Sequence, residues 1–197
     1  MLTINRNHLA ALVHTAAKKD VHYYLQGGLV EITSNGDMHL VSTDGHIAFA
    51  GLVPAPYVHW TSTPQAGPFS IIIPLDVLKR ESKGKTSTVH LVPLDDGKYL
   101  LGETVFTPID GRFPDWRRVC RSPDVSIEAA QYNPDLLARC SAALKAWFGV
   151  GAKFAPYLRQ HGNHVGIMTA NNMTGFCVVM PLKANDPDIK PFVPAPL

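Results

Sequence analysis

The apolar and polar positions of the chain follow two periods, one of two residues and one near 3.6 residues. Short runs bounded by Gly, Asn or Asp predict β-strands, and runs with an apolar residue every three or four positions predict helices. The order of one strand, one helix and three further strands begins at Met1 and begins again near Phe69 and Val125. The pattern therefore predicts three βαβββ units.

Each predicted unit contains one amphipathic helix. The helical regions are 6–19, 75–85 and 133–153. The predicted strands are residues 2–4, 28–34, 38–42, 47–53, 70–73, 88–94, 99–101, 104–109, 126–129, 157–160, 165–170 and 176–182. Such units bury their helices against sheets, so we expect an α+β fold with helices on one face and antiparallel sheets on the other.

The units also indicate how the chain divides. Units 1–68 and 69–121 are expected to form one domain over residues 1–121, and the third unit is expected to form a half-domain over 122–184. Residues 185–197 hold four prolines and no hydrophobic period, which predicts an extended tail.

Composition excludes several classes of protein. Hydrophobic residues make up 46% of the chain and charged residues 17%, which is too apolar and too weakly charged for a disordered protein. The charge-free stretch 45–75 contains five prolines and cannot form a membrane helix. The N-terminus lacks the pattern of a signal peptide, and the three cysteines have no CxxC spacing. We therefore expect a cytoplasmic protein with reduced thiols and no membrane association.

The charges are segregated although the net charge is only +2. The three helical regions hold ten Lys and Arg residues against three Asp and Glu residues, whereas the rest of the chain holds eight against thirteen. This pattern fits a basic helical face that binds a polyanion, opposite an acidic sheet face. It also fits helices that are Lys-rich for solubility alone, and the sequence leaves both interpretations open.

Motifs of catalytic chemistry are missing from the sequence. The nine histidines show neither HxH nor HExxH spacing, and no Walker-type loop, GxSxG or GxGxxG occurs. Asp44 and His46 could imitate an acid–base pair, but two residues apart on a turn they more often serve hydrogen bonding. We therefore expect a protein that is not an enzyme and that holds no metal or cofactor.

Three segments carry a resemblance to a known family. Residues 40–48 read LVSTDGHIA, residues 111–119 read GRFPDWRRV, and residues 178–182 read VVMPL. They are similar, in the same order, to the segments ATDGHRLA, GRFPDYRRV and VVMPM of the bacterial DNA polymerase III beta sliding clamp. The resemblance covers nearly the whole chain up to Lys183.

The resemblance implies a shortened DNA-clamp-like fold. The family's clamp has three domains of two units each, so six units per chain, whereas this sequence predicts three. The first two units look like the family's middle domain, and the third looks like the second half of its last domain.

The resemblance also implies a non-enzymatic DNA-associated processivity or recruitment factor. In the family, basic helices surround duplex DNA and contact phosphates without reading sequence. If the resemblance holds, the candidates for such DNA-facing residues are the basic residues Lys18, Lys19, Lys79, Arg80, Lys83, Arg139 and Lys145 of the helical regions.

A peptide pocket is the second implied surface. The family holds polymerases and other partners by an extended peptide with apolar anchors, between its middle and last domains. The matching positions here are Thr43, Gly45, His46, Ala48, Pro114, Arg118, Val119, Met180, Pro181 and Leu182. Ile47 stands where the family usually has an Arg. Without a pocket, Asp44-Gly45 would be only a turn, residues 180–182 would only end a core strand, and Trp116 would anchor a connector.

The expected partners are duplex DNA, proteins that carry clamp-binding peptides, a clamp loader and further copies of the chain. The family's ring closes with twelve units, so four chains of three units would be needed here. Neighbouring units alternate in orientation, and chains with three units keep this alternation only if they meet through isologous contacts. We therefore expect a tetramer first and a dimer next. The alternative is an adaptor or decoy that keeps the pocket and encircles nothing. The tail, residues 189–197, is expected to fold back over the pocket.

Overall fold

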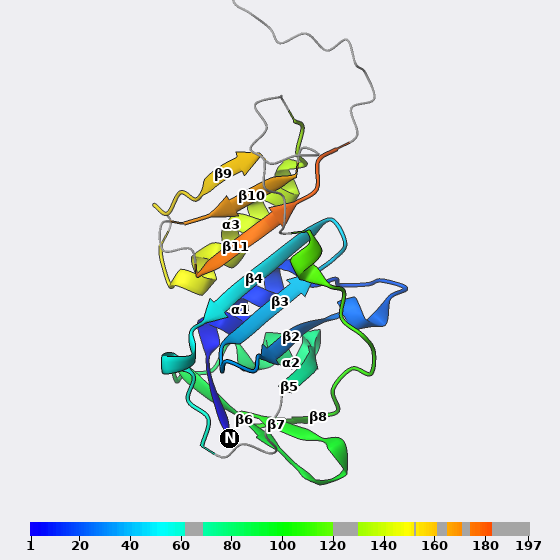
Figure 1. Cartoon of the computed structure of the whole chain (residues 1–197), viewed down its shortest axis with the longest axis vertical. Coiled ribbons are helices and arrows are strands. Elements are labelled where there is room, and N and C mark those ends of the chain that lie inside the picture. Colours follow the sequence, from blue (N-terminus) through cyan, green and yellow to red (C-terminus); the bar gives the residue numbers. More distant parts are fainter. Residues whose placement is uncertain (62–68, 120–129, 152, 161–164, 171–173, 183–197) are drawn as a thin grey trace, which may run out of the picture.

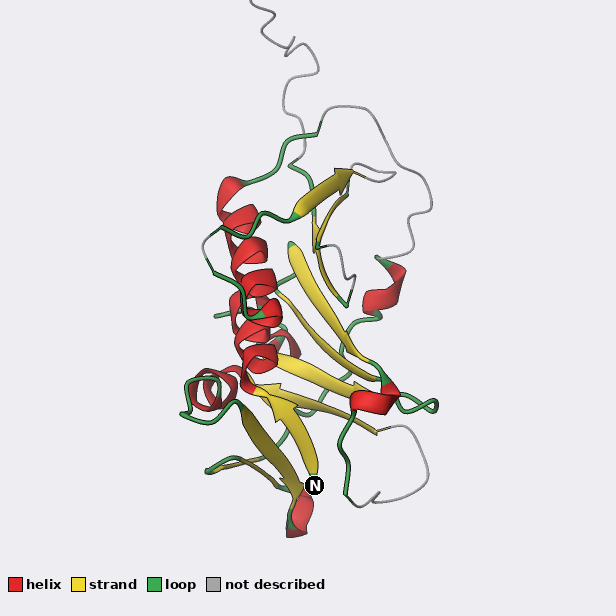
Figure 2. Cartoon of the chain, turned by 90° about the vertical axis from the view of Figure 1, so that its left-hand side faces the viewer, coloured by secondary structure: helices red, strands yellow, loops and turns green. Residues whose placement is uncertain are grey.

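Three helices cover one face of a long antiparallel sheet, and a second, smaller sheet adjoins it. The computed structural model describes residues 1–61, 69–119, 130–151, 153–160, 165–170 and 174–182. Seen edge-on, the helices lie to one side of the seven-stranded sheet (Figure 2). The expected α+β fold, with helices on one face and antiparallel sheets on the other, is confirmed.

The described elements follow the predicted order closely. The helices are α1 (Arg6–Thr15), α2 (Leu75–Glu81) and α3 (Pro134–Phe148), and the short 3-10 turns are η1 (Tyr23–Leu25), η2 (Ala55–Tyr57), η3 (Asp95–Gly97) and η4 (Trp116–Arg118). The strands are β1 (Leu2–Asn5), β2 (Gly27–Ile32), β3 (Met38–Thr43), β4 (Ile47–Val53), β5 (Phe69–Pro74), β6 (Thr88–Pro93), β7 (Tyr99–Leu101), β8 (Thr104–Phe106), β9 (Tyr157–Gln160), β10 (Gly166–Thr169) and β11 (Gly175–Val179). The predicted strand 126–129 and the tail expected to cover the pocket lie outside the described residues.

The first two units exchange their first strands. The smaller sheet has the order β1-β6-β7-β8, and the larger has β5-β2-β3-β4-β11-β10-β9 (Figure 1). β1 thus joins the sheet of the second unit, and β5 joins the sheet of the first. The outer edge of each exchanged strand is also covered, because the Thr3 N–H donates to the His59 carbonyl and the Ile109 N–H donates to the Ile72 carbonyl, both at 3.0 Å. The exchange ties the two units together.

The third unit extends the sheet of the first. β11 pairs antiparallel with β4, with Val178 opposite Ala48 and Phe176 opposite Ala50. The pairing brings together segments that are far apart in the sequence. It also places both units on one continuous sheet, with α1 and α3 packed side by side on its covered face.

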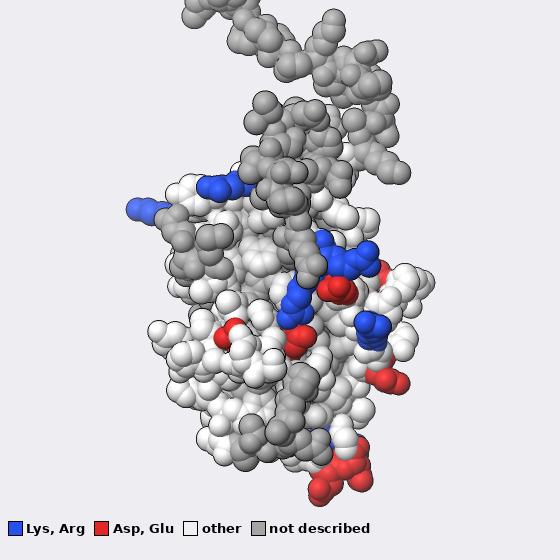
Figure 3. All heavy atoms as spheres, in the orientation of Figure 1, with Lys and Arg blue, Asp and Glu red and all other residues white. Residues whose placement is uncertain are grey.

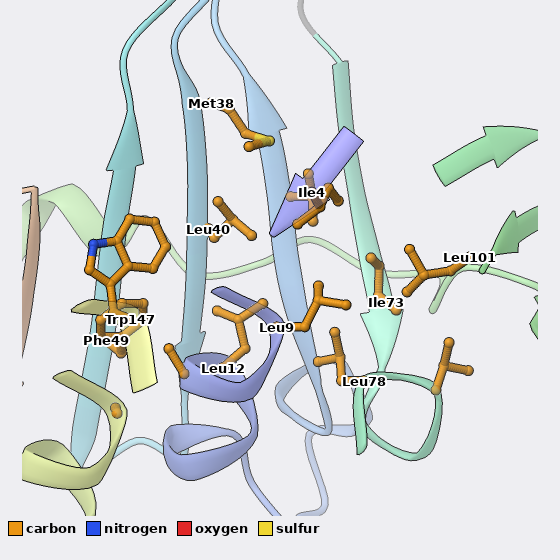
Figure 4. Packing of buried hydrophobic residues seen from close by; sticks show 14 of the residues in the cluster. Ile4, Leu9, Leu12, Met38, Leu40, Phe49, Ile73, Leu78, Leu101 and Trp147 are labelled. Carbon is orange, nitrogen blue, oxygen red and sulfur yellow. The ribbon is translucent and has the colours of Figure 1, made fainter. Parts of the chain in front are cut away.

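The core lies between this sheet and the helices. Leu9 and Leu12 of α1 pack with Leu40 of β3 and Phe49 of β4, all fully buried (Figure 4). Trp147 of α3 fills the space above β4 and β11, where glycine is required: a Cβ at Gly51 would lie 2.4 Å from the indole ring. The join between the first and third units is therefore built around one large side chain.

The helices are shorter than the sequence predicts. α1 ends at Thr15 rather than at residue 19, because the next residue is extended and the Ala17 N–H pairs with the Leu25 carbonyl. α2 ends at Glu81, four residues before the predicted end. α3 ends at Phe148, because Gly149 takes a left-handed backbone and its N–H caps the last turn.

Candidate functional site

The outer face of the large sheet holds the predicted pocket residues Thr43 and Ala48 in one row with Val178, which is not among the predicted residues. Leu40 and Phe49 point into the core, so their neighbours along each strand point outward. Thr43 of β3 lies opposite Ala48 of β4, which in turn lies opposite Val178 of β11. This row crosses from the first unit to the third, and it forms the floor of the candidate site.

The turn between β3 and β4 forms one rim of this floor. Gly45 has a positive φ of 88°, a conformation that glycine adopts without strain. One carboxylate oxygen of Asp44 accepts the N–H groups of His46 at 2.9 Å and Ile47 at 3.0 Å. The Thr43 hydroxyl accepts the Gly45 N–H and donates to the Ile47 carbonyl at 2.7 Å. The turn is therefore fixed by its own side chains.

The chain beyond β11 supplies a second rim. The Met180 N–H donates to the His46 carbonyl at 2.9 Å, so it continues the ladder past the end of the strand. The side chains of Met180 and Leu182 are 40% and 49% exposed although both are large and apolar. These two side chains are accessible to the apolar anchors of an extended peptide, a binding mode in which side-chain contacts give specificity.

η4 lies on the same outer face, close to β3 (Figure 1). Its Trp116 ring packs against His39 of β3, with ring centroids 5.4 Å apart. Arg117 stacks on that indole and pairs with Glu31 of β2 at 2.6 Å. These contacts place the neighbouring Pro114, Arg118 and Val119 on the pocket side of the sheet, with all three side chains exposed.

A cavity of about 700 Å³ lies beside this region, under the segment 107–117. Its floor includes Leu29 and Ile72, and the Glu31–Arg117 pair lies in its wall. Of the predicted pocket residues in the described chain, only Pro114 lines it. The cavity is thus a neighbour of the predicted pocket and does not coincide with it.

The outer face is not the acidic surface that the charge segregation predicts. In the view onto this face, Lys and Arg lie beside Asp and Glu, within a largely uncharged surface (Figure 3). Arg112 and Arg117 line the cavity together with Asp110 and Asp115. The acidic sheet face, one of the two interpretations of the charge segregation, is therefore not seen in this view, where the segment 107–117 contributes two Arg and two Asp side chains.

The predicted basic positions divide between helices and the turns that follow them. Within the shorter helices, five Lys and Arg residues stand against three Asp and Glu residues. Lys18, Lys19 and Lys83 lie just beyond the C-termini of α1 and α2, where cations offset the negative end of the helix dipole. The charge excess thus lies at the helix ends more than on the helices themselves.

The side chains of these basic residues differ in their exposure to solvent and in whether they already have an acidic partner. Lys79, Arg80 and Lys83 are exposed, and Lys145 is half-buried. Arg80 and Lys83 line a second cavity of about 600 Å³, together with Lys85 and with Arg6, which pairs with Glu81. Arg139 is already bound, because its guanidinium pairs with Asp44 of the pocket turn at 2.5 Å.

The described ranges offer neither a metal centre nor a membrane-spanning helix. In those ranges, no group of three or more His, Cys, Asp or Glu side chains is placed to hold a metal ion. None of their helices combines the length and the apolar character that crossing a membrane requires.

Comparisons with known proteins give the same fold and a partial likeness in sequence. No family model matches the chain. The chain is 32% identical over 120 residues to the beta sliding clamp of Salmonella typhimurium, which is 57% of this chain and 31% of that protein. It is 30% identical over 128 residues to the beta sliding clamp of Escherichia coli K12, which is 61% of this chain and 33% of that protein. The alignments thus span about a third of these relatives.

Solved structures cover more of the chain. The DNA polymerase sliding clamp of Pseudomonas aeruginosa has a TM-score of 0.59 and 18% identity over 92% of this chain and 66% of its own. The Helicobacter pylori beta clamp bound to a DNA ligase peptide has a TM-score of 0.65 and 13% identity, with the same coverage. Together with the named relatives, these structures show that the chain is a beta-clamp-like protein with the sliding-clamp fold.

Proposed function

We propose that this chain is a clamp-like recruitment and processivity factor, which holds clamp-binding peptides in the outer-face pocket and contacts duplex DNA with its helical side. One observation carries the proposal. The β4–β11 pairing and the bond from Met180 to His46 bring together the first-unit and third-unit residues that match the family's peptide pocket, while the second-unit residues Pro114, Arg118 and Val119 lie in and beside η4 on the same face. The Helicobacter pylori clamp of the same fold, solved with a DNA ligase peptide, supports this function.

The pocket is proposed to take an extended peptide with Gln and Leu-rich anchors. Thr43, Ala48 and Val178 form its floor, and the apolar side chains of Met180 and Leu182 offer adaptable walls. Arg118 and the turn at His46 supply polar contacts. Isothermal titration calorimetry with such a peptide tests the proposal, and we expect a micromolar dissociation constant, about −8 kcal/mol. A folded protein that gives no heat of binding would contradict it.

The helical side is proposed to contact DNA phosphates loosely. Lys79, Arg80 and Lys83 are exposed, and Lys18 and Lys19 flank the end of α1. Contacts of this kind give binding that depends on salt and not on base sequence. No catalytic step is part of this function.

The alternative function is an adaptor that keeps the pocket and encircles nothing. The small charge excess on the shortened helices favours this alternative, since it weakens the DNA-binding surface that the sequence predicts. Binding to nicked circular DNA separates the two functions. A protein that encircles DNA slides off the free ends once the circle is linearised, whereas the binding of an adaptor does not depend on whether the DNA is circular or linear.

We propose that the chain assembles with further copies, as a tetramer or a dimer. β8 and β9 end the two sheets within the described residues, and Val105 and Leu158 on these strands are exposed. A free strand edge pairs readily with another chain. Light scattering tests the assembly, and a mass near 21.5 kDa at micromolar concentration would contradict it.

A further inference from the structure

Three segments meet behind the pocket turn: the C-terminal end of α1, the middle of α3 and the turn between β3 and β4. Arg139 of α3 joins them. Its Nη1 pairs with the Asp44 Oδ2 at 2.5 Å, and its Nε donates to the His14 carbonyl at 2.9 Å. That carbonyl belongs to the last turn of α1, where the helix leaves acceptors without internal partners.

Asp44 is thereby held from both sides. Its Oδ1 accepts the N–H groups of His46 and Ile47 and so shapes the turn, while its Oδ2 receives Arg139. The side chains of Asp44 and Arg139 are 13% and 31% exposed, so the pair is partly shielded from water. A shielded, hydrogen-bonded pair contributes more than an exposed surface pair.

The position of the turn determines the position of the pocket residues. The His46 carbonyl receives the Met180 N–H, so a shift of the turn moves the exposed Met180 rim with it. On its other side, the turn continues into Ser42, whose buried hydroxyl lies 2.5 Å from that of Thr15 at the end of α1. The rim is thus linked through the turn to the helical side of the sheet.

We propose that Arg139 is a positioning residue for the peptide pocket, which acts by fixing Asp44 and the turn that carries His46. The proposal rests on the proposed peptide-binding function. Arginine suits this position because its planar guanidinium serves two acceptors in different directions, whereas a lysine ammonium cannot reproduce that fork. The side chain comes from the third unit and the turn from the first, so the pair also sets how the two units meet at the pocket.

This assignment differs from a DNA contact, which the sequence resemblance implies for the same residue. The Arg139 guanidinium already has a carboxylate partner, so a DNA phosphate would have to displace the Asp44 carboxylate before it could pair with Arg139. Arg139 therefore contributes little to the salt dependence of DNA binding. Lys145 lies six residues further along the same helix and is half-buried, which makes it the matched control.

The experiment compares Arg139→Met with Lys145→Met in the full chain. We expect Arg139→Met to weaken the peptide about fivefold to tenfold, which is less than the full loss of a charge-assisted hydrogen bond because Arg139 acts on the peptide only through the turn, and Lys145→Met to change it less than about twofold. Arg139→Lys should recover part of the affinity. In NMR spectra of the free protein, the amide signals of His46, Ile47 and Met180 should shift in Arg139→Met and stay in place in Lys145→Met.

Each outcome decides the proposal. Wild-type affinity and unshifted amides in folded Arg139→Met would overturn it. If that variant does not fold, Asp44→Asn takes its place, because the amide oxygen still accepts the turn N–H groups while the partner of Arg139 is lost; unchanged affinity and amides there would also overturn it. If the wild-type protein binds no peptide, the proposed function fails, and the amide shifts still decide whether Arg139 positions the turn.

Discussion

The pocket side and the helical side of this molecule are organised in different ways. On the pocket side, strand register and hydrogen bonds fix the turn at Asp44 against the end of β11. On the helical side, the cations Lys79, Arg80 and Lys83 stand on or beyond the short helix α2, and their side chains are exposed to solvent. A surface with a fixed shape suits the binding of one kind of peptide, whereas solvated cations suit loose contacts with DNA phosphates that allow the protein to slide along the duplex.

The largest expected effect comes from removing the side chain that joins the first and third units. Trp147 is buried against Phe49 and against β4, where Gly51 leaves room for its ring. Trp147→Ala should lower the free energy of unfolding by about 3–5 kcal/mol, because the cavity it leaves cannot close fully. Chemical denaturation measures this. A loss below about 1 kcal/mol would show that the two units do not depend on this packing.

The next effect is a pH dependence at the same join. His8 of α1 stacks on Trp147 with ring centroids 3.9 Å apart, and burial lowers the pKa of this imidazole from 6.5 to about 4. The folded protein therefore keeps His8 neutral while the unfolded chain takes up a proton below pH 6.5. The free energy of unfolding should therefore fall as pH drops from 6.5 toward 4, with a slope that approaches about 1.4 kcal/mol per pH unit between these two pKa values.

The measurement compares unfolding of the wild-type protein and His8→Gln between pH 7 and pH 5. In this range few carboxylates titrate, so buried histidines set most of the slope, and the difference between the two proteins reports His8. The burial of His14 and His39 lowers the pKa of each imidazole and adds to the slope in both proteins. Identical slopes for wild type and variant would show that His8 titrates normally in the folded state.

A smaller effect is expected at the pocket rim. Leu182→Ala or Met180→Ala should weaken the peptide by about 1–2 kcal/mol if these side chains are anchors. Leu94→Ala is the matched control, because Leu94 is 41% exposed, against 49% for Leu182, and lies in the turn between β6 and β7 of the smaller sheet. Calorimetry that finds equal affinities for Leu182→Ala and Leu94→Ala would remove Leu182 from the pocket.

The sequence predicts local structure here better than it predicts what meets across the fold. The strands 47–53, 99–101 and 157–160 have the predicted bounds, because residues next to them in the sequence, mostly Gly, Asp and Pro, mark where each begins and ends. The sequence predicts a later end for α1, because Ala16 and Ala17 favour a helix but are buried in an extended segment instead. Whether the helix continues there depends on a bond to Leu25, which no local pattern reveals.

For the candidate site, too, the sequence predicts individual residues better than it predicts their contacts across the fold. The motif resemblance identifies Thr43, His46 and Met180, and the structure brings these three together. The sequence could not reveal that Arg139 pairs with Asp44, because the partners are distant in sequence and belong to different units. Nor could it reveal the exchange of β1 and β5, which depends on how two similar units pack.

The smallest effect tests the helical side. The triple variant of Lys79, Arg80 and Lys83 to Ala should flatten the salt dependence of duplex binding, by a slope of about 0.9 for each phosphate that the protein no longer neutralises. A triple variant of Lys98, Arg112 and Arg159 to Ala removes the same charge from exposed positions outside the helices and should leave the slope nearly unchanged. If both triples lower the slope equally, net charge and not a helical face governs binding. If neither triple lowers the slope, the helical side does not bind DNA through these cations. The adaptor function is then favoured, because it needs only the pocket.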